Sequence, residues 1–293
     1  MHLDSINQLR QGSPWQDAAV TVLPVPTTDQ VAIALEVNLD NYLAAWHWWR
    51  ERLTHAYPLV IATWGYDSSW EAAIQDSALM SRWECEPVEQ MLQIAAQTTQ
   101  TDLDQYLLEQ IQLLNYAEYV PNLVKNELEK TRTNFGMAPD LPSGMAGDFL
   151  GLEQYLFEWE TQHLASYKIS IEEQTAHQTW YLPINQPMAL LILPISQGWQ
   201  SLAYVPWFGN NLKAMPLIQQ WQSKFGAELV CHYGTMLQFL VKGKAENLQA
   251  NLFEIAWQQL AIAPCTAALP GISIRDHAHA LRHLDRWFLH ERP

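Results

Sequence analysis

The spacing of apolar residues changes twice along this chain, and this change is what most limits how it can fold. Between about residues 87 and 166 apolar side chains recur every three or four positions, as at Leu103, Leu107 and Ile111, which is the period of an amphipathic helix. On either side, short apolar runs bounded by Pro, Gly or Asn alternate with helical segments. The sequence therefore predicts an α+β protein with a mixed or antiparallel sheet, packed helices and a helical middle segment.

The N-terminal part predicts the element order ββαβα. Apolar runs at 20–25 and 31–37 are typical of strands, and a third strand is expected at 59–64. A helix is expected over 40–55, where Tyr42, Trp46, Trp49 and Leu53 recur at spacings of four, three and four and so share one buried face. Ser68 has the spacing of an N-cap for a further helix.

The C-terminal part predicts a ββαββα unit. Strands are expected at 188–194, 200–206, 227–232 and 236–241, and helices at 216–225, at 246–262 and from Asp276 onward. Pro216 suits the first turn of its helix. Gly226 stands between a helix and a strand, where a left-handed residue turns the chain, so we expect a positive φ there. The similar start of the two halves leaves a diverged internal repeat as an open question.

A Gly/Pro-rich segment suggests where the chain divides. Residues 134–147 contain three Gly and two Pro among fourteen residues, which is typical of a linker. The sequence thus predicts an N-terminal domain over 1–133, a linker over 134–147 and a C-terminal domain over 148–293. Asp148 directly follows the linker and can cap the next helix.

Charge is distributed unevenly along the chain. The net charge is −15, and residues 84–173 hold 16 acidic and four basic residues, whereas residues 174–293 hold six and eight. Such an acidic middle segment repels phosphates, so we expect no nucleic-acid partner. It suits a basic protein partner, although solubility alone also explains many acidic surfaces.

Several further features bear on location and chemistry. No apolar run approaches the ~18 residues of a membrane span, and Met1–Ser5 does not begin a secretory signal, so neither a membrane partner nor secretion is expected. The three cysteines, Cys85, Cys231 and Cys265, are far apart, which favours free thiols in the cytoplasm. The sequence contains no G-x-S-x-G, Gly-rich phosphate loop or H-E-x-x-H motif. We therefore nominate no catalytic residue and expect no cofactor.

One histidine pair has the spacing of metal ligands. His279 and His283 lie four residues apart on the expected last helix, where two imidazoles can share a metal. Arg286 and His290 would extend the same face, which we expect to be in solvent. A zinc site needs three or four ligands, so a solvated helix face is the favoured reading and no metal is expected.

Two aromatic loops are the candidate binding sites. Trp64, Tyr66 and Asp67 stand where a strand passes into a helix, a place where ligands often collect, although an ordinary turn is favoured. Trp207, Phe208 and Asn210 surround a glycine in an expected tight turn, and exposed aromatics there would suit a binding anchor as well as a structural role.

The C-terminal third also carries a family resemblance. It contains the runs 189–194, Gly198-Trp199, Trp207-Phe208-Gly209-Asn210, Phe225-Gly226-Ala227-Glu228 and Thr235-Met236-Leu237. This pattern, over roughly residues 180–268 and more weakly at 46–64, resembles the bacterial family known as domain of unknown function 4253. The chain departs from that pattern at Phe208, which replaces a glycine, and at Pro264-Cys265-Thr266, where an acidic residue is usual. The resemblance implies no activity. Some members look like they belong with bacterial toxin-immunity and contact-competition loci, which favours a binding role.

Three functions from different classes follow, and one of them is a purely structural or scaffolding protein. The leading hypothesis is a cytoplasmic, non-catalytic protein-binding protein of the immunity or antitoxin kind. The alternative is an enzyme acting on a small molecule in a cleft lined by the 64–68 and 207–210 loops. An enclosed, polar-lined pocket would favour the enzyme, whereas an exposed aromatic patch would favour docking.

Overall fold

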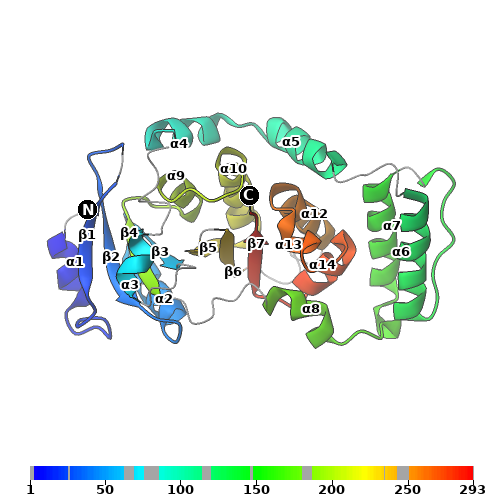
Figure 1. Ribbon diagram of the computed structural model, residues 1–293, viewed down its shortest axis with the longest axis horizontal. Helices are drawn as coiled ribbons and strands as arrows, with labels where there is room; N and C mark the ends of the chain where they lie inside the picture. The colour runs from blue at the N-terminus through cyan, green and yellow to red at the C-terminus, as the bar shows by residue number, and fades with distance from the viewer. Residues whose placement is uncertain are drawn as a thin grey trace. The chain divides into compact units, whose positions relative to one another are not determined.

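The computed structural model describes residues 3–25, 27–62, 69–75, 86–113, 120–145, 148–179, 187–233, 235–242 and 251–292. Contacts divide the chain into two compact units, whose elements are labelled in Figure 1. Unit 1 consists of residues 1–99, 181–243 and 286–293. Unit 2 consists of residues 100–180 and 244–285. Each unit is therefore built from segments that are distant in sequence.

Unit 1 contains a mixed sheet of seven strands in the order β1-β2-β4-β3-β5-β6-β7. Among the strands that the structure describes, only β3 and β5 pair in parallel. All residues of β3, β4 and β5 are buried, as the continuous apolar runs of central strands require, whereas the edge strand β1 is partly exposed. The strands are β1 (Val20–Pro24), β2 (Val31–Val37), β3 (Tyr57–Ala62), β4 (Met188–Leu193), β5 (Ala227–Tyr233), β6 (Met236–Val241) and β7 (Arg286–His290).

Helices of unit 1 pack against this sheet through large aromatic side chains. Helix α2 contacts β3 and β4, and α10 contacts β5. Trp46 and Trp49 of α2 are fully buried, and so is Trp221 of α10, whose ring meets that of Trp287 edge-on at 5.9 Å. The helices are α1 (Leu3–Arg10), α2 (Tyr42–Arg52), α3 (Trp70–Gln75), α4 (Val88–Gln97), η4 (Gly198–Gln200), α9 (Ser201–Tyr204) and α10 (Asn211–Phe225).

All secondary-structure elements among the described residues of unit 2 are helices. Helix α14 forms its centre, since it packs against α7, α8 and α12. Helix α5 packs on α12, and its residues Leu103, Leu107 and Ile111 are buried. The helices are α5 (Gln100–Leu113), α6 (Val120–Phe135), α7 (Phe149–Gln162), η3 (Leu164–Ser166), α8 (Ile171–Thr179), α12 (Leu252–Ile262), α13 (Cys265–Ala268) and α14 (Ile274–Leu281). No helix of the described ranges is long and apolar enough to cross a membrane.

The predicted fold class is confirmed, and so are several of its local signals. The structure is α+β with a mixed sheet, and the acidic middle segment is helical. The predicted stripe of α2 is buried. Asp148 caps α7 by accepting a hydrogen bond from the backbone N–H of Gly151. Gly226 ends α10 with φ of 65°.

Two predicted C-terminal elements differ from the structure. The expected strand at 200–206 is helical, because Gln197 and Gln200 form a capping box that starts η4 and α9 follows directly. A buried apolar run of this length does not distinguish a strand from a helix by periodicity. Helix α10 begins at Asn211, so Pro216 lies inside the helix rather than in its first turn. The ββαββα order therefore does not hold.

The last helix is also shorter than predicted. Ser273 and Asp276 form a capping box that starts α14, which ends at Leu281. The chain then forms β7, drawn in red next to β6 in Figure 1, so Arg286 and His290 belong to a strand. β7 pairs with β6, which lies over 40 residues earlier, and this non-local partner decides its conformation.

The predicted linker region lies within unit 2. Residues 134 and 135 end α6, residues 136–145 follow between α6 and α7, and residues 146 and 147 lie outside the described ranges. The sheet joins strands from both ends of the chain, since β4 lies between β2 and β3. The sequence prediction placed two continuous domains at 1–133 and 148–293, whereas the two compact units are discontinuous in sequence.

Candidate functional site

The two predicted binding loops differ in what the structure describes. Trp64, Tyr66 and Asp67 lie outside the described residues. The second loop, Trp207–Asn210, is described and joins α9 to α10. This second loop, called here the 207–210 loop, is the candidate binding site in unit 1.

Hydrogen bonds hold the 207–210 loop in one shape. The Trp207 indole N–H donates to the backbone carbonyl of Thr235 at 2.9 Å. The side-chain amide of Asn211 also holds the loop. Its Oδ1 atom accepts from the backbone N–H of Trp207 at 2.8 Å, and its Nδ2 atom donates to the backbone carbonyls of Trp207 and Gly209. Asn210 accepts from the Lys213 N–H and so caps α10. Gly209 is required because a Cβ atom there would lie 2.2 Å from the Trp207 ring.

The two aromatic residues of the loop have opposite environments. Trp207 is only 3% exposed and its indole N–H donates to the carbonyl of the half-buried Thr235, so of the two roles left open for this residue the structure favours the structural one. Phe208 is 58% exposed. The loop therefore presents one large apolar ring to solvent on a backbone held by the hydrogen bonds of Asn211 and of the Trp207 indole.

The predicted histidine pair does not lie together in solvent. His279 is 1% exposed, and its Nε2 atom donates to the Glu160 carboxylate at 3.0 Å. His283 is exposed and follows the end of α14. Among the described residues no group of three or more His, Cys, Asp or Glu side chains is arranged to hold a metal ion. Cys231 and Cys265 are not disulfide-bonded, and Cys85 lies outside the described ranges.

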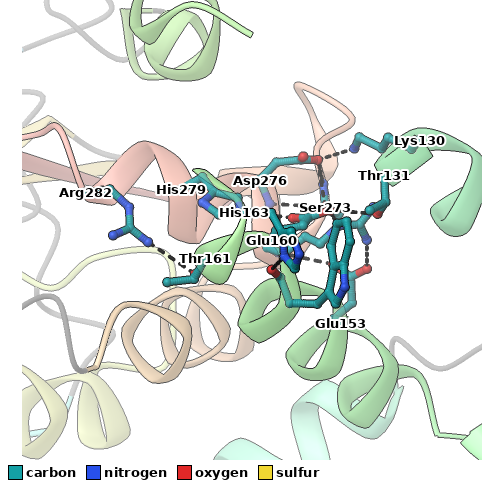
Figure 2. Close-up of polar contacts among 12 residues, drawn as sticks. Lys130, Thr131, Glu153, Glu160, Thr161, His163, Ser273, Asp276, His279 and Arg282 are labelled. Carbon is teal, nitrogen blue, oxygen red and sulfur yellow. Dashed lines mark hydrogen bonds and ion pairs between the residues drawn. The ribbon is translucent and has the colours of Figure 1, made fainter. Parts of the chain in front are cut away.

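His279 belongs to a buried ion-pair cluster in unit 2, which we call the Arg275 cluster. Arg275, 1% exposed, contacts carboxylates from α6 and α7: it pairs with Glu153, with Glu127 at 2.5 Å and with Glu160 at 3.2 Å. Glu160 also accepts from the Thr131 hydroxyl at 2.7 Å. Figure 2 shows Glu153, Glu160 and Thr131 gathered where α6 and α7 meet α14.

A second ion pair adjoins the Arg275 cluster. Asp276 pairs with Lys130 and accepts from the backbone N–H and hydroxyl of Ser273, as the dashed lines in Figure 2 show. Burial raises the pKa of Asp276, but Lys130 and Arg275 outweigh this effect, and the pKa is lowered overall. Asp276 is thus held as a carboxylate that both caps α14 and attaches it to α6.

The electrostatics of the Arg275 cluster follow from burial. Desolvation raises the pKa of Glu153 to about 7, although the Arg275 charge acts in the opposite direction. Burial alone would lower the pKa of Arg275, but the surrounding carboxylates raise it. The polar groups are directed at one another, so the arrangement positions helices rather than a reacting molecule.

Sequence reasoning missed the Arg275 cluster. Glu153 and Glu160 are seven residues apart, which places them on the same face of α7 as the buried Leu152 and Leu156. Carboxylates on an apolar helix face require a buried cation, and this signal is visible in the sequence. The sequence does not show which cation this is, because Arg275 lies more than 100 residues after both carboxylates.

The fold and site together define an α+β protein with one mixed sheet, a helical unit and an exposed aromatic loop. Residues 189–290 match the family model described as Domain of unknown function (DUF4253), which confirms the resemblance seen in the sequence. The match runs from β4 to β7 and includes the 207–210 loop, Gly226 and Arg275. None of the curated proteins and none of the solved structures matches the chain.

Proposed function

We propose that this chain is a non-catalytic protein-binding protein that docks a partner through Phe208. The observation that carries the proposal is an exposed aromatic ring on a rigidly held loop. Aromatic residues are enriched among those that contribute most to binding at protein interfaces. A loop that is already ordered loses little conformational entropy on binding, so more of the contact free energy appears as affinity.

The chemistry of the described residues supports binding over catalysis. The 207–210 loop contributes an aromatic ring and an amide but no titratable side chain. The Arg275 cluster holds most of the buried charge of unit 2, and its carboxylates are engaged with Arg275, Thr131 and His279. The enzyme alternative needs a cleft that includes residues 64–68, whose structure is not described.

The partner that suits this protein is basic. Unit 2 contains 17 acidic and seven basic residues in the sequence. Summed over a surface, such a balance attracts cationic partners and repels acidic ones. A toxin neutralised by an immunity or antitoxin protein is the type of partner that the family resemblance favours.

Site-specific photocrosslinking tests the proposal. A benzophenone amino acid replaces Phe208 in the native host, and matched variants carry it at Ile171, which is 57% exposed, or at Met137, which is 52% exposed. We expect one protein to be captured at position 208 and not at the two control positions. That protein is then purified, and Phe208→Ala should weaken its Kd at least about tenfold.

Two results would contradict the proposal. One is equal capture at all three positions, which indicates non-specific contact of exposed apolar residues. The other is a partner whose Kd does not change in Phe208→Ala while circular dichroism shows that the variant is folded.

A further inference from the structure

Unit 2 contains a surface pocket between α7 and α12 with an unusual lining. Its volume is about 270 Å³, and its described lining residues come from one face of each helix. Gln154, Phe157 and Glu158 lie on α7, and Phe253, Glu254 and Trp257 lie on α12. Small-molecule sites usually measure roughly 300–1,000 Å³. This pocket is better matched to a single side chain.

Three aromatic rings form the apolar part of the lining. The Phe157 and Phe253 ring centroids are 5.6 Å apart, and Trp257 is half-buried one helical turn after Phe253. The Phe157 ring also packs against His279 at 4.9 Å, which attaches this wall to the Arg275 cluster. Ring faces carry partial negative charge and attract cations within about 6 Å.

Two carboxylates form the polar part. The Glu158 carboxylate accepts from the Gln154 amide at 2.9 Å, and the Glu254 carboxylate accepts from the Gln258 amide at 3.0 Å. Each of these pairs spans one helical turn and restrains the carboxylate. The described lining residues include no basic side chain, so neither carboxylate is neutralised within the pocket.

We infer that this pocket binds an arginine side chain of a basic partner protein. Aromatic faces and carboxylates together match a guanidinium group, which stacks on rings through its plane and donates paired hydrogen bonds to a carboxylate through its edge. A lysine ammonium gains the charge attraction without the stacking. An anion would be repelled by both carboxylates, and an apolar group would desolvate them without a partner.

The inference rests on the proposed function in one respect, namely that the arginine belongs to a partner protein. The pocket itself can be tested without any partner. The probe is N-acetyl-arginine amide, which is titrated into the full-length chain while the indole N–H resonances are followed by NMR. The Trp257 resonance is identified by its loss in Trp257→Phe.

We expect the probe to shift the Trp257 resonance saturably. N-acetyl-lysine amide should bind more weakly, and N-acetyl-citrulline amide, which has the same shape without the charge, should produce at least a tenfold smaller shift. The double variant Glu158→Gln, Glu254→Gln should weaken binding of the arginine probe at least tenfold. The matched control is Asp140→Asn with Glu172→Gln, which removes two exposed carboxylates elsewhere in unit 2 and should leave binding unchanged.

Other results would overturn the inference. Equal binding of the citrulline and arginine probes would show that charge is not recognised, and equal loss in the control variant would show a diffuse charge effect. Spermidine that binds tighter than an arginine-containing peptide would show that the occupant is a polyamine rather than a protein side chain. Phe208→Ala should leave arginine binding intact, so failure of photocrosslinking at position 208 alone counts only against the proposed function.

Discussion

The Nε2 atom of His177 lies 3.1 Å from the Nδ1 atom of His277, and both rings are buried in unit 2. The other ring nitrogen of His277, Nε2, makes a second hydrogen bond and lies 2.8 Å from Oε1 of Gln259. Because that oxygen accepts, His277 carries its proton on Nε2, and its Nδ1 atom accepts from His177. This contact therefore links α8, α14 and α12 through two neutral imidazoles.

Acid should destabilise unit 2 through this histidine pair. Burial lowers the pKa of His177 to about 4, and burial together with His177 lowers the pKa of His277. In the unfolded chain both histidines take up protons near pH 6.5, whereas the folded state does not. Stability is thus fully present above pH 6.5 and is lost as the pH falls toward 4.

The expected loss from His177 alone is about 3 kcal/mol, since one pKa unit corresponds to about 1.4 kcal/mol. The measurement is the free energy of unfolding by urea at several pH values. Phenylalanine cannot titrate, so in His177→Phe the free energy of unfolding should depend less steeply on pH between 6.5 and 4. The difference in slope should correspond to the uptake of about one proton. An unchanged slope in that variant would show that His177 is already protonated in the folded protein.

Arg275 should be far more important for stability than an exposed arginine of the same unit. Arg275→Met leaves Glu153 and Glu160 buried without their cation, which we expect to cost about 3–5 kcal/mol. The control is Arg132→Met, because Arg132 pairs with Glu129 and their side chains are 58% and 63% exposed. Its effect should stay below about 1 kcal/mol.

Amide hydrogen exchange in α6, α7 and α14 measures both changes. Combining Arg275→Met with Glu153→Leu should recover part of the loss, since one of the unpaired charges is removed with the cation. If Arg275→Met costs no more than Arg132→Met, the Arg275 cluster does not hold unit 2 together.

Gly226 should tolerate asparagine better than alanine. Its φ of 65° is left-handed, a conformation that a Cβ atom disfavours and that Asn adopts more readily than other residues. Gly226→Ala should therefore lower the free energy of unfolding by ~1 kcal/mol, and Gly226→Asn by about half as much. The urea midpoints of the two variants decide this. Equal midpoints for Ala and Asn would argue against a conformational cause.

The indole N–H of Trp207 should matter for both stability and binding. Trp207→Phe keeps an aromatic ring but removes the donor to the Thr235 carbonyl, which should cost about 1 kcal/mol of stability. It should also weaken partner binding, because the 207–210 loop loses a restraint. Phe208→Ala should weaken binding with little change in thermal stability. If Trp207→Phe and Phe208→Ala lowered stability equally, Phe208 would contribute to folding rather than to partner binding.

The sequence predicted what local patterns determine. The strands at 20–24, 31–37, 227–233 and 236–241 lie within a residue of their predicted bounds, since short apolar runs between turn residues specify them. The caps at Asp148 and Gly226 depend on one or two residues and were also predicted.

The rest depends on contacts between distant residues. Trp207 and Phe208 are neighbours with similar side chains, and the Thr235 carbonyl, 28 residues later, determines which of them turns inward. His279 has the spacing of a solvent-facing metal pair, but Glu160 on α7 makes it a buried hydrogen-bond partner. The discontinuous units likewise result from β4 pairing with β2 and β3, which no local pattern indicates.

The rate at which a basic partner associates with this protein should depend on the salt concentration. Some carboxylates of the acidic middle segment cannot attract a basic partner, since Glu127, Glu153 and Glu160 are engaged by Arg275. The attraction must come from exposed carboxylates, among them Asp102 and Glu109 on α5, a helix without any basic residue. Screening weakens interactions between such exposed charges at distances beyond about 10 Å in 0.1 M salt.

We therefore expect the association rate constant of the captured partner to fall about tenfold between low and high salt, while the dissociation rate changes little. Asp102→Asn with Glu109→Gln should lower the low-salt rate by about twofold. The matched control, Asp17→Asn with Glu36→Gln, changes the same net charge at exposed positions of unit 1 and should have a smaller effect. Surface plasmon resonance gives both rate constants. An association rate that ignores salt, or that responds equally to both double variants, would show that solubility is the role of these carboxylates, because a specific electrostatic attraction depends on where the charges lie.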